Sequence, residues 1–211
     1  MIVPGINTML VVAAAGFAFS LSPGPSMLFV MSRSIGQSRQ AGLASAVGLA
    51  LGGMCLAALT ALGAGAILAD SAALFVAVKL LGGAYLAYLG VRTIIGLRTY
   101  RFEAMSETGS PAPLTAAVRQ GFLVELLNPK TVLFFLAFLP GFIDPDAGNV
   151  GAQMLVLGLL IPLTAIPSDV MVSFLAGSVA EHVNANPKFG IALEVVSASI
   201  LLALAVRVFL G

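Results

Sequence analysis

The sequence has few charged residues, and this scarcity decides its class. Lys, Arg, Asp and Glu make up 9% of its 211 residues, whereas hydrophobic residues make up 59%, and the mean hydropathy is +1.06. A soluble domain carries about 25% charged residues, so this chain cannot cover a water-facing surface. We therefore expect a membrane protein in which residues 1–211 form a single transmembrane domain.

Other scarce residue types exclude several kinds of site. One cysteine cannot form an intramolecular disulfide or a CxxC pair, and one histidine, His182, leaves no histidine pair for zinc. The net charge of +1 gives no indication of nucleic-acid binding. No Lys or Arg precedes Arg33, so the first helix is expected to stay as an anchor rather than act as a signal peptide. We predict no cofactor and no metal.

Long apolar runs are abundant instead. A spanning helix needs about 20 mostly apolar residues, and the charged residues divide the chain into six such runs, which predicts an all-α protein with six transmembrane helices. The runs are 7–31, 41–69, 72–97, 116–142, 151–177 and 189–209. A polar loop at about 98–115 separates two halves, about 1–97 and about 116–211.

Basic residues predict the orientation of these helices. They gather in the first, third and fifth connections, as Arg33, Arg39, Arg98, Arg101, Arg119 and Lys188, whereas the second and fourth carry Asp70, Asp144 and Asp146. The positive-inside rule then makes the odd connections cytoplasmic. Both termini are expected outside the cytoplasm.

The two halves carry signs of an internal repeat. Aligning Pro23 with Pro129 also aligns Ala41-Gly42 with Ala147-Gly148. Three helices per half would insert the second half upside down, the inverted-repeat plan of many secondary transporters, whose site lies between the repeats. Chance similarity between Ala-, Leu- and Gly-rich helices is the alternative.

Two of the predicted helices contain strong breaks. The first has Ser22, Pro23, Gly24, Pro25 and Ser26, and the fourth has Asn128, Pro129 and Lys130. Proline removes a backbone donor and clashes with the preceding turn. Ser and Asn favour the N-cap and Pro the first helical position, so new half-helices are predicted to start with Ser22 and Asn128 as their caps.

Both breaks are predicted to lie near the bilayer midplane. At 1.5 Å per residue, Ser22 is about 16 Å from Arg33 and Asn128 about 13 Å from Arg119, and half of the hydrocarbon core is about 15 Å. Half-helix N-termini present free N–H groups and partial positive charge, which suits a substrate carboxylate. The alternative is that the prolines are kinks satisfied by neighbouring helices.

Three charged residues fall at membrane depth, where a charge costs at least about 2.5–3.5 kcal/mol. We expect Lys130 to meet a substrate carboxylate, and Glu125 or Asp169 to meet an ammonium group or carry a coupling proton. An internal Glu125–Lys130 ion pair is the structural alternative. Pro162 and Pro167 are expected to loosen the fifth helix, and His182 is expected in a connection.

These motifs resemble the LysE/RhtB family of amino-acid exporters. Ser22-Pro23-Gly24-Pro25 resembles its (S/T)PGP motif, residues 121–130 resemble its G-F-L…N-P-K motif, and residues 79–90 resemble a third segment. Two residues depart from the family pattern: Glu125 stands where a polar uncharged residue such as Asn is usual, and Ser26 stands where Asn is common. Glu125 suggests the hypothesis that the substrate is cationic or bears an amine.

The resemblance implies a secondary transporter of the bacterial inner membrane that exports amino acids or close derivatives, by proton antiport. Its partners would be a small-molecule substrate and membrane lipid, and a homodimer is compatible with the sequence. Three rivals stay open. The first is an ion exporter or channel that uses the same midplane site. The second is a membrane-embedded enzyme, although this sequence has no paired histidines and no clustered carboxylates, and the third is a structural membrane subunit, which would not need buried charges.

Overall fold

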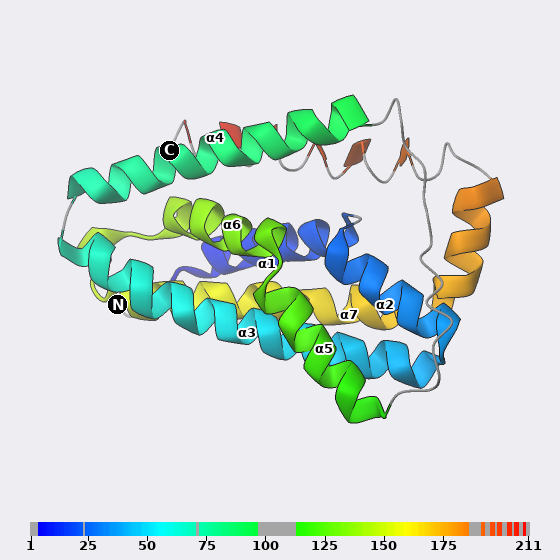
Figure 1. Cartoon of the computed structure of the whole chain (residues 1–211). Helices are drawn as coiled ribbons and strands as arrows, with labels where there is room; N and C mark the ends of the chain where they lie inside the picture. Colours follow the sequence, from blue (N-terminus) through cyan, green and yellow to red (C-terminus); the bar gives the residue numbers. More distant parts are fainter. Residues whose placement is uncertain are drawn as a thin grey trace.

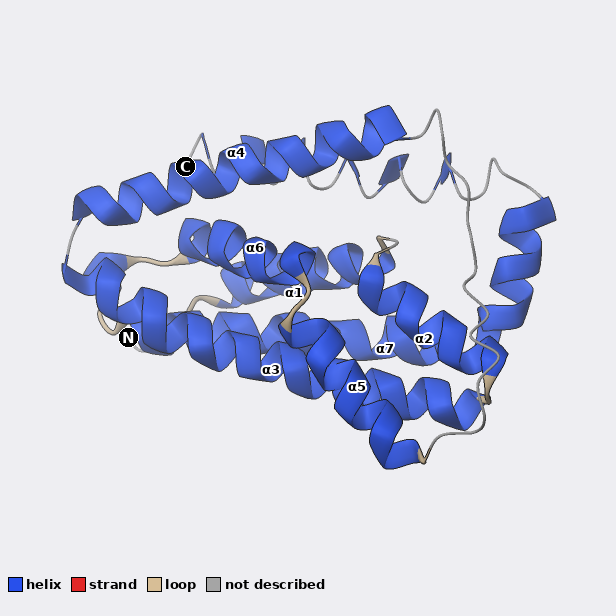
Figure 2. Cartoon of the chain, in the orientation of Figure 1, coloured by secondary structure: helices blue, strands red, loops and turns tan. Residues whose placement is uncertain are grey.

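The protein is a bundle of helices. The computed structural model describes residues 4–22, 24–70, 72–96 and 113–185, with scattered positions between 191 and 209. Figure 2 shows helices and connecting loops but no strand in these residues. In chain order the elements are α1 (Ile6–Leu21), α2 (Pro25–Gly36), α3 (Arg39–Asp70), α4 (Ala72–Gly96), α5 (Leu114–Leu126), α6 (Pro129–Phe138), the 3₁₀ turns η2 (Leu139–Phe142) and η3 (Pro145–Ala147), and α7 (Val150–Ala185). The predicted all-α membrane class is confirmed.

Several helices have the length and composition of membrane spans. Arg39–Gly63 of α3 and Val150–Ala176 of α7 could each cross a membrane alone, and the bent pairs α1–α2 and α5–α6 would each form one more span. Large side chains on the bundle surface fit a lipid surrounding, since Leu62, Leu81 and Leu127 are more than two-thirds exposed. The sixth predicted span, most of the central loop and Lys188 lie largely or wholly outside the described residues. The count of six, the inverted repeats and the orientation stay predictions.

The fifth predicted helix is longer and more regular than expected. α7 continues through Pro162 and Pro167 without a break. Each of these prolines follows an isoleucine, whereas Pro129 follows the capping residue Asn128. Because α7 extends to Ala185, His182 lies in a helix and not in a connection, and that expectation was wrong.

Close backbone contacts fix the position of α5 against α3. A Cβ on Gly48 would lie 2.1 Å from the Val118 carbonyl oxygen, and one on Gly121 would lie 2.4 Å from the Ser45 carbonyl oxygen. In lipid, small residues of this kind let helix backbones approach closely. One turn further along, a Cβ on Gly52 would lie 2.9 Å from the Glu125 Cβ. Gly48, Gly52 and Gly121 thus form a glycine seam between α3 and α5, and this seam places Glu125 against α3.

The two bent pairs lie against each other in opposite directions (Figure 1). Phe19 of α1 stacks on Phe134 of α6, with ring centroids 4.0 Å apart. At the other end, the Arg33 guanidinium of α2 donates to the Gln120 side-chain oxygen of α5, at 2.9 Å. The first half of one bent pair thus meets the second half of the other. An inverted repeat requires this arrangement of the two broken helices.

Candidate functional site

The first break separates α1 from α2 with a bend of 54°. Ser22 ends α1 as its C-cap, and α2 begins at Pro25 with Gly24 as its N-cap and no side-chain cap. The prediction that Ser22 caps the new half-helix was wrong, because the second proline of the motif takes the first helical position and moves the start forward. Pro23 lies outside the described residues.

The second break separates α5 from α6 with a bend of 50°, and it follows the prediction. Asn128 is the N-cap, and its side-chain oxygen accepts a hydrogen bond from the Lys130 backbone N–H at 3.0 Å. Pro129 occupies the first helical position, where its missing N–H costs nothing. This half-helix supplies its own cap.

Lys130 connects the two breaks. Its Nζ donates a hydrogen bond to the Ser22 backbone carbonyl at 3.0 Å and lies 4.6 Å from the centre of the Phe19 ring. A Cβ on Gly24 would lie 3.2 Å from this Nζ, so the glycine leaves room for the lysine. The Lys130 side chain thus bonds to the first break, and the alternative of a Glu125–Lys130 ion pair stays open.

Glu125 of α5 is also hydrogen-bonded across to the first break. The Asn128 side-chain amide donates to Ser26 Oγ at 2.9 Å, and Ser26 Oγ donates to the Glu125 carboxylate. The Asn128 oxygen already caps Lys130, so the direction of this chain of donors is fixed toward Glu125. Ser26 and Glu125, the two departures from the family pattern, are thus partners. Sequence reasoning placed each beside the site but did not find the contact, which crosses between α2 and α5.

Asp169 approaches from α7 and has different surroundings. Its side chain is only 9% exposed, yet among the described residues none donates a hydrogen bond to its carboxylate. It lines the same cavity as Glu125, and the two carboxylates repel each other. A buried carboxylate without donors is costly, so Asp169 favours a cation or a proton beside it.

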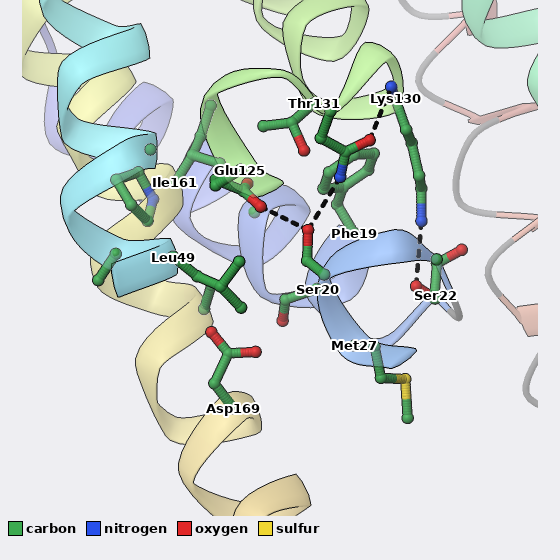
Figure 3. A pocket seen from close by; sticks show the side chains of 18 of the residues that line it. Phe19, Ser20, Ser22, Met27, Leu49, Glu125, Lys130, Thr131, Ile161 and Asp169 are labelled. Atoms are coloured by element: carbon green, nitrogen blue, oxygen red, sulfur yellow. Dashed lines mark hydrogen bonds between the residues drawn. The ribbon is translucent and has the colours of Figure 1, made fainter. Parts of the chain in front are cut away.

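The cavity lies where the two breaks meet α3 and α7 (Figure 3). Its non-atom space, which includes the part that opens outward, is about 610 Å³. The predicted site residues that line it are Ser22, Gly24, Ser26, Glu125, Asn128, Lys130 and Asp169. Pro25 and Pro129 start the half-helices and are absent from the described lining.

Part of the lining was not predicted. Phe19, Leu49 and Ile161 give the cavity an apolar wall, and Ser20 and Thr131 add hydroxyl groups. Ser20 Oγ lies 2.6 Å from Ser168 Oγ, which ties α1 to α7 beside Asp169. Only their positions in the sequence could have identified some of these residues, because Phe19 and Ser20 directly precede the first break and Thr131 follows the second.

The cavity therefore combines three kinds of group. One ammonium, from Lys130, and two carboxylates, from Glu125 and Asp169, face a largely apolar space, with Lys130 and Asp169 on opposite sides of the view in Figure 3. In the part of the chain that the structure describes, no three His, Cys, Asp or Glu side chains gather to hold a metal ion. The arrangement suits a small molecule with a carboxylate, an amine and an apolar portion.

Comparison with known proteins identifies relatives of this chain. Residues 17–211 match the family model described as LysE type translocator. An uncharacterized membrane protein of Pseudomonas aeruginosa is 36% identical over 147 residues, covering 69% of this chain and 68% of the relative. A leucine efflux protein of Salmonella typhimurium is 31% identical over 145 residues, with 69% and 68% covered, and one of an Enterobacter strain is 30% identical over 159 residues, with 75% and 74% covered. No solved structure matches.

Proposed function

The chain belongs to the LysE type translocator family, and from this membership together with the cavity between the helix breaks we propose that it exports amino acids by proton antiport. The family consists of transporters, so the chain is a membrane transporter and not an enzyme. The names of its relatives make leucine the first substrate to test. The membrane is then the inner membrane of a bacterium, with both termini outside the cytoplasm.

One observation carries the proposal: Lys130 reaches from one helix break to the other inside a cavity that both breaks line. A substrate carboxylate would bind beside this ammonium and the uncapped start of α2, where N–H groups and the helix dipole favour an anion. The wall formed by Phe19, Leu49 and Ile161 would hold an apolar side chain. Glu125 and Asp169 are the candidates for the amine and the coupling proton.

Alternating access would follow from movement of one three-helix half against the other around this cavity. The bends of 54° and 50° would then act as a hinge in each half, beside the proposed substrate. Opening toward the cytoplasm would load the amino acid, and opening outward would release it.

The test is an export screen followed by reconstitution. Bacterial cells that accumulate leucine from a leucine-containing dipeptide should release it faster when they express the protein, and Lys130→Gln should remove the gain. Proteoliposomes should then show counterflow of labelled leucine that an imposed pH gradient accelerates. Failure to export any of the common amino acids would refute the proposal, and flux without counterflow would identify a channel instead.

A further inference from the structure

Two carboxylates line one cavity, but their surroundings differ in a way that assigns them different tasks. Glu125 accepts a hydrogen bond from Ser26, which is itself held by Asn128. These donors join α2 to the α5–α6 break through the Glu125 side chain. The carboxylate therefore already serves as a structural acceptor, and moving it would cost the bond from Ser26, one of those that join the two breaks.

The Asp169 carboxylate is not held by a described donor in this way. Asp169 is nine-tenths buried, its carboxylate takes no hydrogen bond from a described residue, and the cavity opens directly beside it. The hydroxyl of Ser173, one turn along α7, donates instead to the Asp169 backbone carbonyl at 2.8 Å. A charge in this position requires a partner from the cavity, and the groups able to enter are a proton or a cation.

The charged groups that face Asp169 can be named for each helix. α5 contributes Glu125 and α6 contributes Lys130, whereas the described lining from α1, α2 and α3 contains no titratable side chain. Lys130 donates to Ser22 at the first break, and Glu125 adds repulsion. With both carboxylates ionised these three groups sum to one negative charge, so the empty cavity attracts one further positive charge.

We infer that Asp169 is the exchange site at which a proton and the ammonium group of the substrate take turns, whereas Glu125 is a positioning residue for the helix breaks. This rests on the proposed export of amino acids. When the cavity faces the cytoplasm, the substrate ammonium donates N–H bonds to the Asp169 carboxylate, and the proton held there leaves to cytoplasmic water. When the cavity faces outward, the amino acid departs with its ammonium intact and the carboxylate takes a proton from the outside water.

The exchange defines a substrate class. One proton enters for each ammonium exported, so a free amino group is essential for coupling. A carboxylic acid of the same shape without the amino group cannot drive proton release. The carboxylate of the substrate binds elsewhere, beside Lys130, and does not affect this count.

Proton release on binding gives a direct test. Leucine, or the amino acid that the screen identifies, is added to the purified full-length protein in weakly buffered detergent containing a pH indicator, from mildly acidic to neutral pH. The wild type should release up to one proton per leucine bound, and isocaproate, which is leucine without its amino group, should release none. Asp169→Asn should abolish the release, and Asp169→Glu should restore it.

Glu125→Gln is the matched control, because it neutralises the neighbouring carboxylate in the same cavity. It should weaken leucine binding by disturbing Ser26 and Asn128, and because it removes one repelling charge it should move the proton release to lower pH without abolishing it. Release that persists in Asp169→Asn, or that is absent at every pH in Glu125→Gln while leucine still binds, would overturn the assignment. If Asp169→Asn does not fold, the Glu125→Gln count and the isocaproate result still decide.

The two proposals can fail separately. A wild-type protein that exports leucine without releasing protons on binding would leave the export proposal standing and remove the exchange site. A wild-type protein that exports no amino acid would remove both.

Discussion

The two helix breaks have similar sequences but are stabilised differently. At the α5–α6 break, Asn128 caps the new half-helix with its oxygen and holds Ser26 with its amide. At the α1–α2 break, no side chain caps α2, and the Ser22 carbonyl is satisfied by Lys130 from the other break. One break supplies its own hydrogen bonds, and the other depends on its partner.

This difference indicates where a ligand can act. A half-helix that caps itself has little need of an anion, whereas the open start of α2 retains the attraction for negative charge that its dipole creates. The ammonium of Lys130 stands beside that start, over the Phe19 ring and against Gly24. We therefore expect α2, rather than α6, to bind the substrate carboxylate.

Removing the lysine should have the largest effect. Lys130→Gln loses a charge-assisted hydrogen bond worth about 1.5–3 kcal/mol, so the KM for leucine in proteoliposomes should rise by about 10- to 100-fold. Arg39→Gln makes the same change of charge at an exposed position and should leave the KM unaltered. An unchanged KM in Lys130→Gln would place the carboxylate elsewhere.

Removing the cap of the self-sufficient break should have the next largest effect. Asn128→Ala loses the bond to the Lys130 N–H and the bond to Ser26, which together should lower the free energy of unfolding by about 1–3 kcal/mol. Asn149→Ala is the matched control, because Asn149 also accepts a backbone hydrogen bond, from Ala152 at 3.0 Å. Thermal melting in detergent should show a greater loss for Asn128→Ala, and equal losses would show that the link to Ser26 adds nothing.

Removing the Ser22 hydroxyl should have the smallest effect. The Lys130 link uses the Ser22 backbone carbonyl, which alanine retains, so Ser22→Ala should change the free energy of unfolding by less than about 1 kcal/mol. The KM should change by no more than about twofold. If Ser22→Ala lowers the free energy of unfolding as much as Asn128→Ala does, Ser22 and Asn128 have equivalent roles at their breaks, as the sequence predicted.

Local chemistry explains why the sequence could predict the breaks. Proline after Asn128 and the two prolines around Gly24 act on the adjacent backbone, so both interruptions were predicted from residue type alone. The start of α2 was misplaced because two prolines compete for the first helical position. In α7, Pro162 and Pro167 are compatible with a continuous helix, which residue type alone did not predict.

Contacts across the bundle were beyond the sequence. The bond from Lys130 to Ser22 and the bond from Ser26 to Glu125 join residues about a hundred positions apart, and they exist only because α1–α2 and α5–α6 run in opposite directions. The three charged residues could be chosen because charge is rare and costly in lipid. Which of them would be bonded and which left open depended on the packing.

The glycine seam between α3 and α5 has a consequence for natural variation and for protein engineering. At Gly48 and Gly121 even a methyl group would collide with a backbone carbonyl, so a library of random substitutions should return almost no functional variant there. The seam joins a helix of the first half to a helix of the second, so the proposed movement of the two halves would have to turn about this contact. Intolerance to every substitution along this seam, beside tolerance on the lipid-facing sides of the same helices, would identify that axis without a second structure.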